Sequence, residues 1–131
     1  MNQKHDIENH ADVERMVNSF YDKVRQNPEL KYFFDDVAAV NWDEHLPKLQ
    51  AFWRSVLFGE VAFKGNPMLT HIMLNRKAKL TAANFQTWLG LFEKNMDEHF
   101  AGPMASSAKS KAKSIAALML HKIQLSEKPE P

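Results

Sequence analysis

The apolar residues of this chain recur at every third or fourth position, which constrains the fold more than any other feature of the sequence. Between residues 11 and 26, for example, Val13, Val17 and Phe20 fall on one side of a helix, and Tyr21 borders that stripe. Alternating runs of β-branched residues between turn signals, which indicate strands, are missing. A chain of 131 residues can bury one core but not two. The sequence therefore predicts a single all-α domain.

Proline, glycine and capping residues divide this domain into helical segments. Pro28 ends the first helix, because the residue before a proline avoids the α region, and Gly59 is a plausible end for the third. The predicted helices are residues 11–26, a short turn around residues 30–34, a helix from Asn41 or Asp43 to Gly59, a short helix through His71 within the weak segment 59–79, residues 81–100 with Thr81 as cap, and residues 104–125. We expect residues 1–10 to form an N-terminal extension, residues 11–125 the domain, and residues 126–131 a frayed tail.

Composition excludes several kinds of chemistry. The chain contains no cysteine, so it has no disulfides, no thiolate metal ligands and no prosthetic group attached through cysteine. Its 17 basic and 16 acidic residues give no overall field that would attract nucleic acid or an anionic membrane. The N-terminus lacks the apolar core of a signal peptide, and no run reaches the roughly 20 apolar residues that a membrane helix requires. We therefore expect a cytoplasmic protein that binds neither nucleic acid nor membranes.

His71 lies within an otherwise apolar run from Pro67 to Leu74. An imidazole in such surroundings needs a partner, and a backbone carbonyl is the ordinary one. A haem iron is another, because neutral imidazole is the usual nitrogen ligand of haem in globins and peroxidases, and an apolar wall would cover the porphyrin. His71 alone does not decide between these alternatives.

Three further residues place a ring with a polar group on the apolar faces of predicted helices: Tyr21, His45 and Trp88. Each has a structural explanation by itself. The Tyr21 hydroxyl could bond to a carbonyl, Trp88 could belong to the core, and His45 could face solvent near a helix start. Together they would need three separate buried partners. One polar ligand, on the side of a haem opposite His71, would serve all three.

Four stretches of the sequence resemble the truncated haemoglobins, and within them the third group. They are Phe20-Tyr21, Trp42-x-x-His45-x-Pro47-x-x-x-x-Phe52-Trp53, the isolated His71, and Phe85-x-x-Trp88-Leu89-x-Leu91-Phe92. The resemblance covers roughly residues 13–120 and rests on the order and spacing of these stretches. The chain also lacks the Gly-Gly pairs that are common in the first two groups. The resemblance implies a shortened globin, a two-over-two helical sandwich around a non-covalent b-type haem.

The resemblance also implies roles for individual residues. His71 would be the proximal iron ligand, and Tyr21, His45 and Trp88 would form a polar distal side. The other expected haem contacts are Phe33, Phe34, Leu49, Phe52, Trp53 and Arg76, together with Trp88. Arg76 and Lys48 are candidate partners of the haem propionates because they flank the proposed pocket residues.

We expect the protein to bind O₂, NO or CO on the haem face opposite His71, with Tyr21 and Trp88 donating hydrogen bonds to O₂. Charge-assisted bonds of this kind contribute about 1.5–3 kcal/mol each, so the site would hold O₂ too long for simple delivery. We expect a monomer.

Two other functions stay open. The first is a haem redox enzyme that reduces peroxide or oxidises NO, which would need an external reductase because the chain encodes no electron-transfer domain. The second is a haem-free bundle that binds a metal through His45, His71 and His99. The sequence disfavours it, because it lacks the carboxylate and histidine pairs that such bundle sites use.

Overall fold

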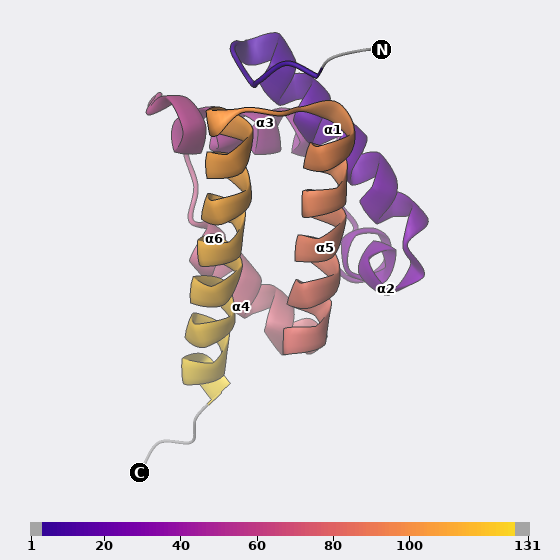
Figure 1. Cartoon of the computed structure of the whole chain (residues 1–131). Coiled ribbons are helices and arrows are strands. Elements are labelled where there is room, and N and C mark those ends of the chain that lie inside the picture. The colour runs from indigo at the N-terminus through magenta and orange to yellow at the C-terminus, as the bar shows by residue number, and fades with distance from the viewer. Residues whose placement is uncertain (1–3, 128–131) are drawn as a thin grey trace.

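The structure, a computed structural model, describes residues 4–127 and contains over that range only helical elements. They are α1 (His10–Gln26), α2 (Pro28–Lys31), the π-helical segment η1 (Tyr32–Val37), α3 (Trp42–Phe58), α4 (Pro67–Lys77), α5 (Ala82–His99) and α6 (Pro103–Glu127) (Figure 1). The predicted all-α fold is confirmed. Within the described residues, no helix is long and apolar enough to cross a membrane.

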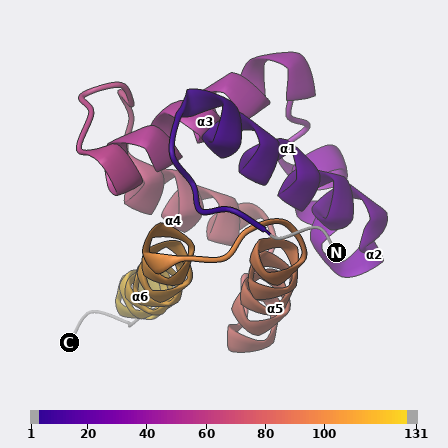
Figure 2. The same cartoon turned by 45° about the horizontal axis from the view of Figure 1, so that its top comes forward.

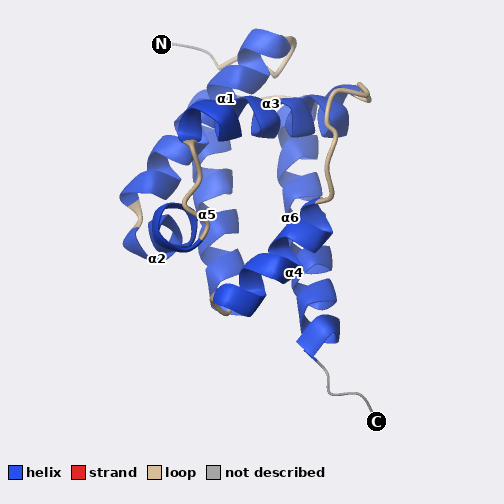
Figure 3. Ribbon diagram, turned by 180° about the vertical axis from the view of Figure 1, so that it is seen from behind, coloured by secondary structure: helices blue, strands red, loops and turns tan. Residues whose placement is uncertain are grey.

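The helices form two layers. Figure 2 shows α1 and α3 on one side and α5 and α6, seen nearly end-on, on the other. The helix α1 packs against both α3 and α5, while α6 packs against α5, α3 and α4. Figure 3 shows α4 crossing near the end of α5 that is farthest from α1 and α3. The helix α4 therefore crosses at that end of the fold, where it packs against α6 and η1.

Local sequence signals explain where the helices begin and end. The side chain of Asn41, rather than Asp43, caps α3 by accepting the N–H of Asp43 at 3.0 Å. Gly59 ends α3 in the left-handed conformation at φ 69°, as the sequence predicts. Thr81 forms a capping box with Asn84 at the start of α5. Pro47 lies in the second turn of α3, because the helix begins at Trp42.

The C-terminal helix differs from its predicted extent. It runs to Glu127, two residues beyond the predicted end at Leu125, so Ser126 and Glu127 belong to α6 rather than to a frayed tail. The rest of that predicted tail, residues 128–131, lies outside the described residues, as do residues 1–3 of the predicted extension.

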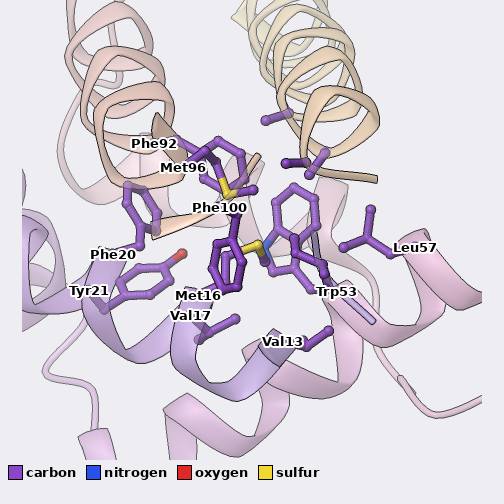
Figure 4. Packing of buried hydrophobic residues seen from close by; sticks show 14 of the residues in the cluster. Val13, Met16, Val17, Phe20, Tyr21, Trp53, Leu57, Phe92, Met96 and Phe100 are labelled. Atoms are coloured by element: carbon purple, nitrogen blue, oxygen red, sulfur yellow. The ribbon is translucent and has the colours of Figure 1, made fainter. Parts of the chain in front are cut away.

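The main core joins α1, α3 and α5 through large apolar side chains (Figure 4). Trp53 of α3 is only 2% exposed, and its ring stacks on Phe92 of α5 with centroids 5.0 Å apart. Trp88 stacks on Phe92 as well, at 5.6 Å, and Phe20 of α1 meets Phe92 edge-on at 5.2 Å. Such aromatic pairs each contribute about 0.5–1.5 kcal/mol beyond the area they bury. This cluster fixes the three helices relative to one another.

A buried amide adds a specific link between α1 and α5. Asn95 is fully buried, donates through Nδ2 to the carbonyl of Met16 at 3.1 Å, and accepts from Lys23 Nζ at 3.0 Å. Because a buried amide without partners is costly, sliding either helix along the other would break both bonds. Asn95 therefore sets the register of the two helices that carry Tyr21 and Trp88.

The residues before α1 pack onto the domain. Ile7 is 3% exposed and joins the main core, and the Asp6 carboxylate accepts the N–H groups of Met104 and Ala105 at 2.8 Å each. Burial opposes ionisation of Asp6, but these backbone donors outweigh it and lower the pKa of the carboxyl group. The predicted N-terminal extension is thus anchored to the start of α6 over its described part.

Candidate functional site

A cavity of about 720 Å³ lies between the two layers, within the usual size range of small-molecule sites. Side chains from α1, η1, α3, the loop of residues 59–66, α4, α5 and α6 line it, and most of them are apolar. The predicted site residues that line it are Tyr21, Phe33, Phe34, His45, Lys48, Leu49, Phe52, Trp53, His71 and Trp88. Residues predicted from separate segments therefore meet around one space.

His71 is positioned by its own helix. The N-cap Asn66 and Pro67 at the first position start α4, which places the His71 ring one turn above the Pro67 carbonyl. The distance from Nδ1 to that oxygen is 2.7 Å, so we assign the ring hydrogen to Nδ1 and a free lone pair to Nε2. Burial lowers the pKa of His71, and the bond to Pro67 acts in the opposite direction. A neutral imidazole with a free Nε2 is the form that binds a metal.

The carbonyl bond of His71 is the arrangement expected of an ordinary core histidine, and it is equally the bond that orients a metal-binding one. The surroundings distinguish the two. An ordinary core histidine would be covered by other side chains, whereas His71 lines the cavity and is half-buried.

Tyr21, which stands on α1, lines the same cavity and carries a hydroxyl group. Its side chain is 5% exposed, and its ring packs edge-on against Phe20 and Phe34 at centroid distances of 4.7 and 5.8 Å. Burial raises the pKa of Tyr21 to about 12, although a hydrogen bond donated by Trp88 works against that shift. The phenol is therefore neutral at physiological pH and keeps the hydrogen that it needs as a donor.

His45 stands near the start of α3 between two aromatic rings. Phe34 and Trp42 lie 5.9 and 5.6 Å from its ring, and Trp42 is held in turn by a bond from its indole nitrogen to Asp35 at 2.9 Å. Burial is the main cause that lowers the pKa of His45, followed by the electrostatic effects of Lys48 and His71. His45 is thus half-buried, neutral near pH 7 and part of the cavity lining.

The sequence prediction missed several lining residues. Leu69 and Met73, which are one turn apart on α4, line the cavity. Phe63, Lys64 and Lys77 line it as well. Leu69 and Met73 are four residues apart and so share one side of α4, which is a signal that could have found them together. No comparable signal marks Phe63 or Lys64, which come from an irregular loop.

Two predicted roles do not agree with the structure. Arg76 does not line the cavity: its side chain is exposed and donates to the sulfur of Met73 at 3.5 Å, while the next residue, Lys77, takes the lining position. His99 lies at the end of α5, 3.3 Å from Arg15, and does not line the cavity that His45 and His71 share. Among residues 4–127 there is no group of three or more metal-binding side chains. The structure therefore gives no support to a three-histidine metal site.

Known proteins share both the sequence pattern and the fold. A family model described as bacterial-like globin matches residues 5–124. The chain is 28% identical over 112 residues to "Group 3 truncated hemoglobin ctb" of Campylobacter jejuni subsp. jejuni, a match that covers 83% of this chain and 86% of the relative. The crystal structure of a group III truncated haemoglobin from Campylobacter jejuni has a TM-score of 0.82 and 25% sequence identity, and the match covers 92% of this chain and 95% of that chain.

Proposed function

Because this chain belongs to the bacterial-like globin family, whose members generally bind haem, we propose that it holds a non-covalent b-type haem in the cavity and binds O₂, NO or CO there. The predicted resemblance to group III truncated haemoglobins is confirmed. The observation that carries the proposal is the His71 ring, which commits Nδ1 to the Pro67 carbonyl and keeps Nε2 free beside an apolar cavity.

The lining of the cavity fits a haem. Apolar side chains would cover the porphyrin faces, and neither Asp nor Glu is among the lining residues. The lysines Lys48, Lys64 and Lys77 are the cations that could pair with the two propionates. Lys77 replaces Arg76 in this role, since Lys77 lines the cavity and Arg76 does not.

Haem would supply an iron that binds a diatomic ligand, and Tyr21, His45 and Trp88 would determine how long that ligand stays bound. Tyr21 would donate its hydroxyl hydrogen, and Trp88 would donate its indole hydrogen once that hydrogen leaves the Tyr21 oxygen to which it is bonded in the structure. Bonds of this kind to a partly anionic ligand are worth about 1.5–3 kcal/mol each in a buried site. O₂ gains more from them than CO, because bound CO carries little negative charge.

A redox enzyme is the second candidate. The observation that favours it is the presence of three hydrogen-bonding side chains, Tyr21, His45 and Trp88, around one apolar cavity. Such groups help to polarise an O–O bond, as peroxide reduction and NO oxidation both require. Repeated turnover would need a source of electrons.

Haem titration tests the proposed function. Adding haem to the purified protein should give one equivalent of tightly bound pigment, whose absorption spectrum changes on reduction and again on addition of CO. A protein that shows no saturable haem binding would contradict the proposal. Steady-state assays with peroxide and with NO then separate the two candidates, because a binding protein shows ligand affinity without multiple turnover.

His45→Leu should change the ligand association rate more than the dissociation rate. The His45 side chain is half-buried near a helix start and is held only by ring contacts, so it obstructs the approach to the cavity without being fixed as a donor. We expect association to change about threefold to tenfold and dissociation less than twofold, since no strong bond to the ligand is lost. Flash photolysis of the CO form measures association, and stopped-flow replacement measures dissociation. The reverse pattern would make His45 a direct donor.

A further inference from the structure

Trp42 differs in location from the other two tryptophans of the chain. Trp53 and Trp88 line the cavity, whereas Trp42 does not line it and is partly exposed at the first position of α3. Its ring nevertheless packs against two residues of the cavity wall, because the ring centroids of Tyr21 and Phe34 lie 5.8 and 5.3 Å from it. A continuous set of aromatic contacts therefore leads from the cavity to the surface and ends at Trp42.

Two charged side chains contact the Trp42 ring. Its indole N–H donates to the Asp35 carboxylate, with 2.9 Å between Nε1 and Oδ1. On the face of the ring, the guanidinium of the exposed Arg25 lies 4.9 Å from the ring centroid. The fold does not require the first of these contacts, because water could accept the same hydrogen from a partly exposed indole. The bond to Asp35 places a base in direct contact with the acidic hydrogen of Trp42.

Such a base makes an indole easier to oxidise. Removal of one electron from the ring leaves a cation radical, whose N–H is far more acidic than that of the neutral ring. The Asp35 carboxylate stabilises this cation by its charge and can take up the proton. The charge of Arg25 opposes the cation, but it acts over a longer distance and has no such effect once the proton has moved and the radical is neutral.

The oxidisable side chains of the cavity wall lack a base of this kind. The Trp88 side chain is hydrogen-bonded to the Tyr21 hydroxyl, which is a poor proton acceptor. Neither Asp nor Glu is among the described residues that line the cavity. A cation formed on Tyr21 or Trp88 would therefore be buried without a counter-charge, which is costly. Loss of an electron is thus more favourable at Trp42 than at these cavity residues.

We infer that Trp42 is the residue at which oxidising equivalents leave the haem cavity, and that it is oxidised when the haem-loaded protein reacts with H₂O₂. The inference rests on the proposed function, because haem must occupy the cavity and pass electrons to the peroxide. One H₂O₂ takes up two electrons and two protons and leaves as two water molecules. Trp42 supplies the electrons one at a time past the rings of Tyr21 and Phe34, and Asp35 accepts the indole proton.

The fate of oxidised Trp42 depends on whether another electron donor is present. A one-electron donor at the surface returns an electron and a proton, so it is oxidised without entering the cavity. In the absence of a donor, Trp42 loses a second electron and adds water, which breaks a ring C–H bond and forms a C–O bond. Tryptophan and H₂O₂ then give hydroxytryptophan and one water molecule. Trp42 is therefore a site of oxidative modification, at which the residue gains one oxygen atom.

The test treats the ferric, haem-loaded protein with a few equivalents of H₂O₂ and locates added oxygen by peptide mass spectrometry. Asp35→Asn removes the base but keeps the size of the side chain. Asp36→Asn makes the same change at the next residue, which is exposed, and is the matched control. We expect the wild type and Asp36→Asn to add oxygen at Trp42 to the same extent, and Asp35→Asn to add about tenfold less, because a hydrogen bond to a charged group is lost.

A spectroscopic measurement provides the second readout. Samples frozen soon after mixing with H₂O₂ should show an indole radical by electron paramagnetic resonance in the wild type, and Trp42→Phe should lack that signal. Apoprotein treated in the same way should keep Trp42 unmodified. A haem-loaded wild type with unmodified Trp42, equal modification of the apoprotein, or equal losses in Asp35→Asn and Asp36→Asn would overturn the inference. Haem titration and the CO spectrum of the same samples are measured first, so a failure of the proposed function is seen separately and removes this inference with it.

Discussion

Replacement of His71 by alanine should speed haem loss by more than about 100-fold, since even the loss of a residue that only orients a metal ligand costs about 10- to 100-fold in affinity. His71 is the only residue of α4 with a ring nitrogen available to the cavity, and the apolar walls that remain bind the porphyrin without holding the iron. The fold should survive, because α4 contributes no buried residue to the core. Transfer of haem to an excess of apo-globin measures the loss rate.

His99→Ala is the matched control for this variant. It removes the same imidazole from the end of α5, outside the cavity, and should leave haem retention within a factor of two. If His71→Ala retained haem with an unchanged ferrous spectrum, the iron ligand would have to be His45, the other histidine that lines the cavity.

Tyr21→Phe should increase the O₂ dissociation rate about 10- to 100-fold and change CO dissociation far less. The substitution removes a hydroxyl but keeps the ring that packs against Phe20 and Phe34, so it deletes a donor worth about 1.5–3 kcal/mol without opening a cavity. The pKa of about 12 keeps the phenol protonated, so the O₂ dissociation rate of the wild type should not depend on the ionisation of Tyr21 between pH 6 and about pH 10. Stopped-flow ligand replacement measures both rates.

Trp88→Phe and the double variant complete the comparison. Trp88→Phe should act in the same direction but more weakly on selectivity, because it also removes part of the stack on Phe92 and leaves a void. In the double variant the two effects should be less than additive, since two donors to one ligand atom partly replace each other. Equal acceleration of O₂ and CO in Tyr21→Phe would indicate a steric role and contradict the donor model.

Helical periodicity and capping residues were enough to predict most elements. The apolar faces that the sequence predicts for α1 and α5 are buried in the main core, so the sequence pattern and the packing agree. The helix α4 is different. Its apolar residues Leu69 and Met73 border a cavity instead of another helix. The helical signal in this part of the sequence is therefore weak, although the segment forms a regular helix of 11 residues.

Which residues line the cavity depends on the direction in which each side chain leaves its helix. Tyr21, His45 and Trp88 line one cavity and stand on helices whose apolar faces are evident in the sequence, whereas His71 is marked by its position as the single imidazole of an apolar run. Arg76 flanks the proposed pocket residues in the sequence, but nearness in sequence does not determine which residue faces a cavity, because one residue along a helix turns a side chain by about 100°. Lys77 faces the cavity instead. The bonds from the N–H groups of Met104 and Ala105 to the Asp6 carboxylate could not be predicted either, because they join segments almost 100 residues apart.

The stack of Trp53, Phe92 and Trp88 also gives the protein an optical signal. The chain has three tryptophans, and two of them lie on the wall of the cavity while the third, Trp42, lies 5.8 Å from Tyr21. A haem in that cavity would accept excitation energy from all three indoles, because they lie well within the range over which such transfer is efficient. The apoprotein should therefore fluoresce and the loaded protein should be nearly dark, so tryptophan emission alone would report the fraction of molecules that carry haem.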